Sequence, residues 1–355
     1  MSDYAVYSFM PMVGDLVVNQ DKRATKFSHD NEIAKPHYYK VTLDNGIMTE
    51  MAPTTRGVHL RFSYPSTGDA YLVIDGYTDM SEIKIDPAKR QISGWVNNQR
   101  FVNDSKSFRS YFVVQFDKAF EDYGVWENQK DEIFPQKQEG EGKGYGAYIK
   151  FKKGSKVQAK AASSYISAEQ ALVTLNQELG KDKNLETTKV RGQKTWNELL
   201  NRVLVEGGTD EQMKTFYSCL FRANLFSRKF YERKENGEPY YYSPYDGKVY
   251  DGYMYTDNGF WDTFRSQFPL TNILHPTMQG RYMNALLAAQ EQCGWLPSWS
   301  APGETGGMLG NHAISLLADA WAKGIRSFDP EKALKAYAHE ACLLYTSPSP
   351  RDGAT

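Results

Sequence analysis

Apolar and polar positions along the first part of the chain predict β-structure. From Val6 to about Lys160, short runs rich in β-branched and aromatic residues, such as Tyr111–Phe116, are separated by turn signals such as Asp44–Gly46. Because the runs are short and no helical period separates them, the pattern predicts an antiparallel β-sandwich over residues 1–165. No strand is followed by a glycine-rich phosphate loop, which argues against a nucleotide-binding fold.

The hydrophobic period changes to that of helices at Ser167. This residue begins a near capping box ahead of apolar positions that recur one turn apart. A second helix is predicted over residues 187–205, and a third begins with Thr209 as its N-cap. Later helices are predicted over residues 261–274, 276–293, 308–323 and 330–341. We therefore expect a helical linker over residues 166–206 and a helical toroid or bundle over 207–341, whose loops build a cleft.

Composition narrows the classes of function. The chain has 42 Lys+Arg and 43 Asp+Glu residues, so it lacks the basic surplus that a nucleic-acid-binding surface needs. No apolar run approaches the roughly 18 to 20 residues that span a bilayer, and no signal peptide is visible at the start. The cysteines Cys219, Cys293 and Cys342 form no CxxC pair. The 18 Phe, 24 Tyr and 7 Trp residues suit a ring-stacking cleft for carbohydrate, although aromatic residues more often form plain core.

The residues with the clearest chemistry follow a long tyrosine-rich stretch, Phe230–Phe260. Trp261 and Asp262 combine an apolar ring platform with a hydrogen-bond acceptor, which is the combination that grips a pyranose. Arg265 lies one helical turn from Asp262 and is spaced to pair with it. The alternative interpretation is a plain helix N-terminus, with Asp262 at the positive end of the dipole and Trp261 buried.

A second loop, Gly294–His312, carries two tryptophans, Glu304 and His312. Its glycines allow the backbone to approach a ligand closely, but glycines also serve simple turns. Asp319 follows on the next helix, where it either reaches the cleft or lies on a solvent-exposed face of the helix. The remaining histidines have no His or Cys partner at metal-ligand spacing, so they do not predict a metal site.

Several ordered motifs resemble glycoside hydrolase family 92. Thr256–Ser266, Gly294–Trp299, Met308–His312 and Ala318–Gly324 are similar to successive motifs of that family, and Phe27–Tyr39 resembles its N-terminal domain at the matching distance upstream. The resemblance implies a multi-domain β + α protein. Its parts are an antiparallel β-sandwich, a helical linker and the first part of an (α/α)6 toroid, which is the order that periodicity predicts.

The resemblance also implies an activity. Members of the family are Ca2+-dependent, inverting exo-α-mannosidases, mostly bacterial and exported, which release terminal mannose from α-mannosides such as N-glycans. We therefore expect α-mannoside glycans as binding partners, α-1,2-mannosidase activity in glycoprotein catabolism, and a periplasmic or extracellular location for the complete protein. Trp261 and Asp262 are implied to hold the mannose to be released, and the loop from Glu304 to His312 is implied to form part of the cleft wall.

An inverting glycosidase needs a carboxylic acid and a carboxylate base about 6.5 to 9.5 Å apart. By the resemblance, both groups and the main calcium ligands lie C-terminal to Ala318–Gly324, with no counterpart before Ala341. The chain is therefore expected to hold no catalytic residue and no metal ligand. We expect it to be inactive alone.

The last residues differ from the rest. Residues 342–355 carry no helix C-cap, and the run Cys342–Asp352 back-translates into a string that resembles a transposon-type sequencing adapter read in frame. We expect this tail to be an artefact at the end of a fragment, because family members are longer at both ends. The alternative is a natural Pro/Ser-rich tail.

Three other classes stay open. Another sandwich-plus-toroid enzyme, such as a phosphorylase or a trehalase-like hydrolase, shares the predicted architecture. A non-catalytic carbohydrate-binding protein would keep the aromatic residues and lack the carboxylate pair. A structural protein is the third alternative, against which the tyrosine-rich stretch argues only mildly.

Overall fold

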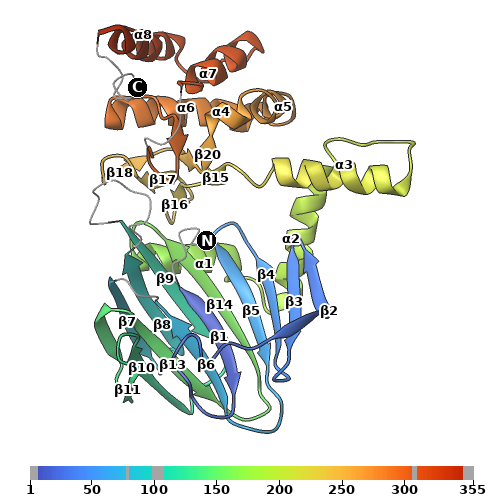
Figure 1. The fold of residues 1–355 in the computed structure, drawn as a ribbon, viewed down its shortest axis with the longest axis vertical. Coiled ribbons are helices and arrows are strands. Elements are labelled where there is room, and N and C mark those ends of the chain that lie inside the picture. The colour runs from blue at the N-terminus through green and yellow to red at the C-terminus, as the bar shows by residue number, and fades with distance from the viewer. Residues whose placement is uncertain (1–6, 77–79, 98–107, 306–309, 347–355) are drawn as a thin grey trace, which may run out of the picture. The chain divides into compact units, whose positions relative to one another are not determined.

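Two compact units make up the chain in the computed structural model (Figure 1). The first unit comprises residues 1–98 and 107–201, and the second comprises residues 99–106 and 202–355. The structure describes residues 7–76, 80–97, 108–305 and 310–346, with side chains up to residue 341. The tail expected to be an artefact falls outside the described side chains, and residues 347–355 fall outside the described residues.

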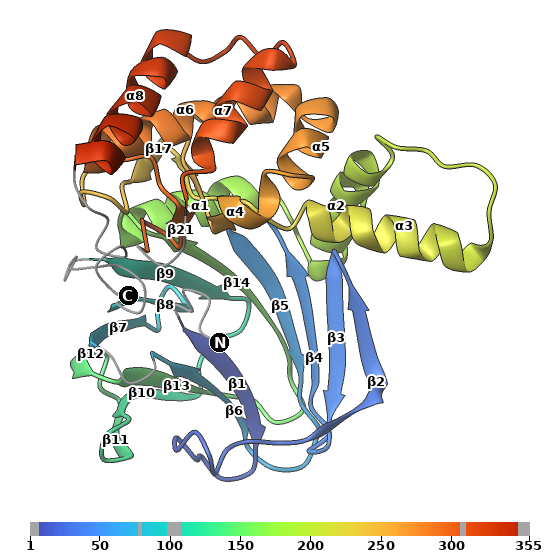
Figure 2. The same cartoon turned by 45° about the horizontal axis from the view of Figure 1, so that its top comes forward.

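The first unit is an antiparallel β-sandwich, as the sequence predicts (Figure 2). Its sheets have the strand orders β1-β6-β13-β10-β11 and β12-β7-β8-β9-β14-β5-β4-β3-β2. The smaller sheet consists of β1 (Ser8–Val13), β6 (Ala70–Asp75), β13 (Tyr145–Phe151), β10 (Asp122–Glu127) and β11 (Glu132–Pro135). The larger sheet consists of β12 (Glu139–Lys143), β7 (Met80–Asp86), β8 (Gln91–Asn97), β9 (Arg109–Phe116), β14 (Lys156–Ser164), β5 (Gly57–Ser63), β4 (Met48–Pro53), β3 (Tyr38–Leu43) and β2 (Phe27–Lys35).

Alternating side chains of the strands form the core of the sandwich. In β7, Ile83 and Ile85 are buried, whereas Lys84 between them is exposed. Ile83 belongs to one large apolar cluster with residues from both sheets, including Leu72 of β6 and Phe112 of β9. Because successive side chains of a strand point to opposite faces, this alternation gives each sheet one apolar face to bury.

Strand β2 forms an edge of the larger sheet and is almost wholly exposed. Its pairing with β3 is irregular, because the register shifts between Phe27 and Glu32. After the shift, Glu32 accepts a hydrogen bond from Tyr39 of β3 (2.6 Å) and contacts His29 (2.6 Å). The segment Phe27–Tyr39 that resembles the family therefore folds as this edge strand and the start of its neighbour.

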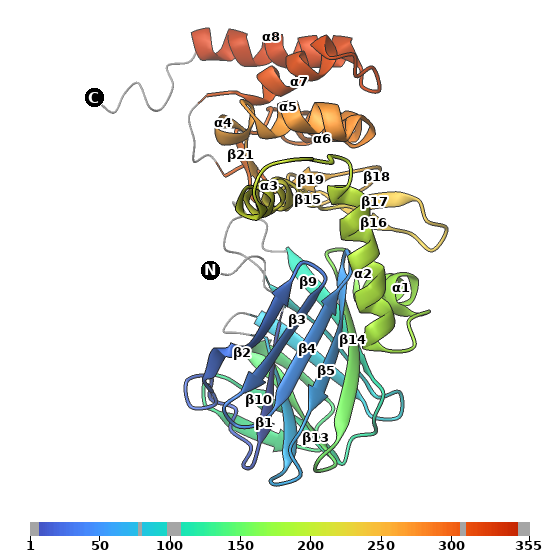
Figure 3. The same cartoon turned by 90° about the vertical axis from the view of Figure 1, so that its right-hand side faces the viewer.

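Helices α1 (Ala168–Leu179) and α2 (Leu185–Leu200) belong to the same compact unit as the sandwich (Figure 3). Ser167 caps α1 as predicted, since its hydroxyl accepts a hydrogen bond from the Gln170 amide (3.1 Å). Ala171 and Leu175 pack on Val113 and Ala162 of the larger sheet. Asn184 caps α2 in the same way, through the Thr187 amide (3.0 Å). Both helices of the expected linker are therefore anchored on the sandwich.

A buried polar cluster joins α2 to β5. His59 is 1% exposed, and its Nδ1 lies 2.9 Å from the hydroxyl of Thr188. That hydroxyl donates its hydrogen to Asp182 (2.8 Å), so His59 Nδ1 carries a hydrogen and donates to Thr188. Burial lowers the pKa of His59 to about 4, which keeps the ring neutral at pH 7.

Acidification is expected to destabilise the first unit through His59. Its folded-state pKa lies below the ordinary value of 6.5, so the unfolded chain binds a proton that the folded unit does not. The contribution of His59 to stability is complete above about pH 6.5 and is lost as the pH falls toward 4, by roughly 2 kcal/mol. Thermal melts between pH 7.5 and 4 measure this loss. His59→Asn keeps a donor without titrating and should flatten the slope, so equal slopes in both proteins contradict the prediction.

Helices dominate the second unit, and α6 (Pro276–Cys293) packs against three of them (Figure 1). Its neighbours are α5 (Gln267–Leu274), α7 (Ala313–Ala322) and α8 (Pro330–Thr346). Helix α3 (Asp210–Ala223) begins with the predicted N-cap Thr209, which forms a full capping box with Gln212. None of the described helices is long and apolar enough to cross a bilayer.

The single helix predicted over residues 261–274 is wrong. The chain forms a one-turn helix, α4 (Phe260–Thr263), and restarts at Gln267 as α5. Ser266 between them has non-helical angles (φ −137°, ψ −53°). In a continuous helix, Pro269 would clash with the Arg265 carbonyl, whereas in the first turn of α5 its missing N–H costs nothing. Helix α8 also differs from the sequence expectation, because it continues past Ala341.

The tyrosine-rich stretch forms short strands, and its tyrosines are buried (Tyr231, Tyr241 and Tyr255) or half-buried. It forms the strands β16 (Glu232–Arg233), β17 (Pro239–Tyr242), β18 (Val249–Asp251), β19 (Tyr255–Thr256) and β20 (Asn258–Gly259), and β15 (Arg228–Lys229) directly precedes it. Tyr231 packs edge-on against Tyr253 and Tyr255, and Tyr255 stacks on Tyr282 of α6 (4.9 Å between centroids). Most of these rings therefore stabilise the unit and do not present a sugar platform.

Candidate functional site

The turn before α4 is held in an uncommon backbone conformation. Asp257 has a left-handed φ of 59°, which Asp tolerates better than most residues. Its carboxylate forms an ion pair with Arg228 (2.6 Å), and β15 pairs with β19 on the same side of the turn. These contacts fix where the chain enters α4.

Trp261 lies on α4 with 46% of its surface exposed. The alternative interpretation expected this ring to be buried, which it is not, whereas Asp262 does lie in the first turn of a short helix, as that interpretation expected. The expected pairing of Arg265 with Asp262 does not form. The guanidinium of Arg265 instead donates to the Trp261 carbonyl (3.0 Å) and lies over the ring of Phe264, 4.4 Å from its centroid.

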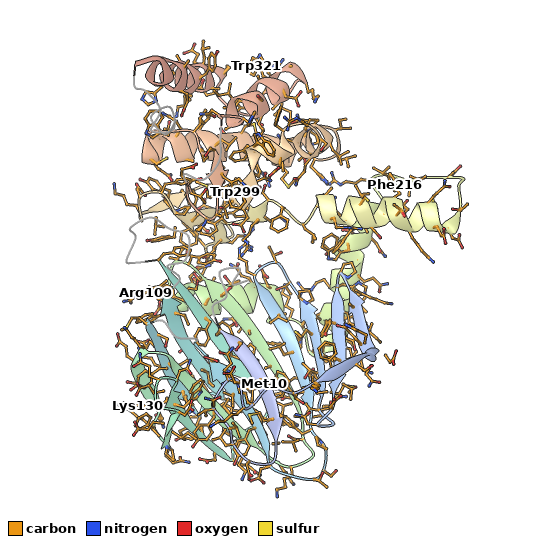
Figure 4. All side chains as sticks on the ribbon, in the orientation of Figure 1. Met10, Arg109, Lys130, Phe216, Trp299 and Trp321 are labelled. Carbon is orange, nitrogen blue, oxygen red and sulfur yellow. The ribbon has the colours of Figure 1, made fainter. Side chains whose placement is uncertain are left out.

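Asp262 and Trp299 meet at Gly259. Strand β20 pairs with β21 (Trp299–Ser300), with Gly259 opposite Trp299. Figure 4 labels Trp299 among the side chains of the second unit. A Cβ on Gly259 would lie 2.0 Å from the Trp299 Nε1 and 3.1 Å from the Asp262 Oδ2. Only glycine leaves room for both groups, so the structure brings the two motif-bearing segments together at this point. Sequence reasoning did not select Trp299, although its loop carries the tryptophans that gave the signal.

Glu304 acts within its own loop. Its carboxylate accepts hydrogen bonds from the Ser298 amide (2.6 Å), the Ser298 hydroxyl (2.8 Å) and the Trp299 amide (3.4 Å). These bonds fold the segment that carries Trp299 against Gly259. The carboxylate therefore holds the loop that brings Trp299 opposite Gly259.

His312 lies next to the end of α4. Its ring is nearly parallel to that of Phe264, with 4.4 Å between centroids and 10° between planes. Trp261, Asp262 and His312 are thus gathered around one helical turn. Asp319 is not in that group: it pairs with Lys323 (2.6 Å) and accepts a hydrogen bond from Asn272 (2.8 Å).

The carboxylates near this turn have different ion-pair and hydrogen-bond partners. Asp257 and Asp319 are ion-paired, Glu304 is bound by its loop, and Glu340 accepts a hydrogen bond from the Leu296 amide (2.6 Å). Asp262 forms no ion pair within the described part of the chain, which leaves its oxygens able to accept from a ligand. Across those same residues, no group of three or more His, Cys, Asp and Glu side chains is placed to hold a metal ion.

The chain belongs to glycosyl hydrolase family 92. The N-terminal domain of that family matches residues 1–164, and its catalytic domain matches residues 170–354. The resemblance seen in the sequence motifs is confirmed.

The chain is similar to solved mannosidases of the family. It is 43% identical to an inverting mannosidase of family GH92 from Bacteroides thetaiotaomicron, with a TM-score of 0.89 over 93% of this chain and 44% of that one. A second α-mannosidase of the family from the same organism is 25% identical, with a TM-score of 0.84 over 94% of this chain and 47% of that one.

A curated relative is the "Uncharacterized secreted glycosidase" of Arthroderma benhamiae. It is 23% identical over 254 residues, which are 63% of this chain and 32% of the relative. The chain therefore spans about a third of that relative's length and less than half of the length of the two mannosidases.

Proposed function

We propose that the chain is part of an exo-α-mannosidase that releases terminal α-1,2-linked mannose from glycans, such as N-glycans, with inversion. Membership of the family and the likeness to an inverting mannosidase and an α-mannosidase support this proposal. The observation that carries it is the exposed Trp261 ring beside a carboxylate, Asp262, that no cation of the described chain neutralises. The ring offers an apolar face to a pyranose, and the carboxylate accepts from its hydroxyls.

Within this function, the described residues bind the sugar and do not transfer the proton. Inversion requires two carboxyl groups on opposite sides of the glycosidic bond. Asp262 is one available carboxylate, whereas Asp257, Glu304, Asp319 and Glu340 are each held by other protein groups. We therefore propose that the acid and the base come from outside the described residues, and that this chain alone binds mannosides without hydrolysing them.

The proposal also covers the calcium requirement and the location of the complete enzyme. Among the described residues, no group of three or more His, Cys, Asp and Glu side chains is placed to hold an ion, so we assign no step to calcium. We propose that the complete enzyme needs Ca2+, a hard cation that takes oxygen ligands, supplied by other residues. A periplasmic or extracellular location is supported by the curated relative, which is described as secreted.

Calorimetry with methyl α-mannoside and methyl α-glucoside tests the binding role of this chain. We expect weak binding of the mannoside and weaker binding of the glucoside, with no mannose released. Release of mannose by this chain would contradict the division of roles, and preference for the glucoside would favour another sandwich-plus-toroid enzyme. The complete enzyme should release mannose from an aryl α-mannoside, and a chelator should stop it. A complete protein that binds but never hydrolyses would favour the carbohydrate-binding alternative.

A further inference from the structure

We propose that Asn258 and Thr263 form a clamp that positions α4 so that Trp261 and Asp262 face the sugar. The proposal rests on the function proposed above for these two residues. Asn258 and Thr263 are positioning residues in it, and neither touches the substrate.

The clamp is a chain of side-chain hydrogen bonds. The Thr263 hydroxyl donates to the Asn258 Oδ1 (2.6 Å), and the Asn258 Nδ2 donates to the Ser227 hydroxyl oxygen (2.8 Å). That oxygen also accepts from the hydroxyl of Tyr282 on α6. Burial raises the pKa of Tyr282 above its ordinary value, so its hydroxyl remains a donor. The chain of bonds therefore ties the last residue of α4 to α6.

Helix α4 needs such support because it is a single turn. Forming one hydrogen-bonded turn fixes several dihedral angles for one bond, so a turn of this length is unstable alone. Its N-cap, Gly259, has no side chain to satisfy the first amides. The bond from the Phe264 amide to the Phe260 carbonyl (3.1 Å) closes the turn. Asn258, which is 3% exposed, bridges the turn from its start to its end.

The positions of the residues along α4 agree with the proposed clamp. Phe260 and Thr263 are three positions apart and therefore share one face of the helix. Phe260 is 1% exposed and packs near Phe268, and Thr263 is held by Asn258. Trp261 and Asp262 lie between the two anchored residues and are both exposed. Because Phe260 and Thr263 are held in place, the rest of the turn is held as well. The directions of the Trp261 ring and the Asp262 carboxylate are therefore set.

Thr263→Val tests the clamp, because it keeps the shape of the side chain and removes the hydroxyl. We expect the affinity for methyl α-mannoside to fall about fivefold to tenfold, the effect of roughly one hydrogen bond. Hydrogen exchange of the Phe264 amide, whose bond closes the turn, should become faster. Thr263→Ser restores the hydroxyl and should bring both measurements back near those of the unmodified chain.

Thr271→Val is the matched control. Thr271 is half-buried like Thr263, and its hydroxyl contacts the carbonyl four residues earlier (2.9 Å), as that of Thr263 does (3.0 Å). Thr271 has no bond to a side chain such as Asn258 among its described contacts. Its variant should leave both the affinity and the exchange of α4 unchanged. If Thr263→Val does not fold, Ser227→Ala breaks the same chain of bonds from outside α4 and should change both measurements in the same direction.

The outcomes separate the clamp from the proposed function. The clamp is overturned if Thr263→Val or its substitute Ser227→Ala leaves affinity and exchange unchanged, or behaves like the control. Loss of affinity without faster exchange also overturns it, because Thr263 would then act on the sugar directly. Faster exchange without loss of affinity overturns it as well. If the unmodified chain binds no mannoside, the proposed function fails, and the exchange of α4 alone decides the clamp.

Discussion

Asp262→Ala in the complete enzyme is expected to lower kcat/KM for an aryl α-mannoside by about a hundredfold or more. A charged acceptor that binds sugar hydroxyls contributes roughly 1.5 to 3 kcal/mol per hydrogen bond, and such bonds count most where they strengthen in the transition state. Trp261→Ala should act in the same direction, because it removes the ring that we propose the sugar faces. Steady-state kinetics at saturating Ca2+ measure both effects.

Two further variants make this prediction specific. Asp262→Asn keeps the shape and loses the charge, so it should retain more activity than alanine and less than the unmodified enzyme. Asp251→Ala removes an exposed carboxylate of the same unit that pairs with Lys234, and it should leave kcat/KM unchanged. Unchanged kinetics in Asp262→Ala would remove Asp262 from the site.

Arg61→Met is expected to lower the free energy of unfolding of the first unit by about 3 to 5 kcal/mol. Glu50 is 4% exposed and accepts two hydrogen bonds from Arg61 and one from Tyr38, each 2.6 Å long. Burial alone would raise the pKa of Glu50, but the bonds from Arg61 and Tyr38 outweigh it and hold the pKa below its ordinary value. Removing Arg61 leaves this carboxylate buried without its cation.

Denaturant unfolding at pH 7 measures the loss. Arg61→Met with Glu50→Gln removes both charges, so it should be clearly more stable than Arg61→Met alone. Lys194→Met breaks an exposed pair with Glu198 and should change the free energy of unfolding by less than about 0.5 kcal/mol. A loss below about 1 kcal/mol in Arg61→Met, or no recovery in the double variant, would count against the prediction.

Local signals predicted the architecture well. The caps Ser167 and Thr209 were visible in the sequence because a cap needs only a hydroxyl and amides within three residues of it. The short runs of β-branched and aromatic residues between turn signals identified the sandwich for the same reason, since each run and each turn is a local feature of the sequence. Trp261 and Asp262 were selected as candidates because their chemistry is adjacent in sequence, and the structure shows that both side chains are exposed.

The rest of the site depends on contacts that are distant in sequence. The approach of Trp299 to Gly259 follows from the pairing of β20 with β21, and neither strand is long enough to be predicted. The break between α4 and α5 was available in the sequence, because Pro269 is incompatible with the interior of one long helix. The hydrogen bonds to the Glu304 carboxylate were not predicted, because the sequence does not show whether a glutamate is free or bonds to its own loop.

The irregular edge of the larger sheet bears on how the protein behaves at high concentration. A long, regular edge strand offers a row of free amides and carbonyls on which another chain can add a strand. In β2 the shift in register after Phe27 interrupts that row, and the charged residues Asp30 and Lys35 face solvent beside it. The same irregularity that makes β2 look poorly formed therefore protects the sandwich from joining sheets with its neighbours.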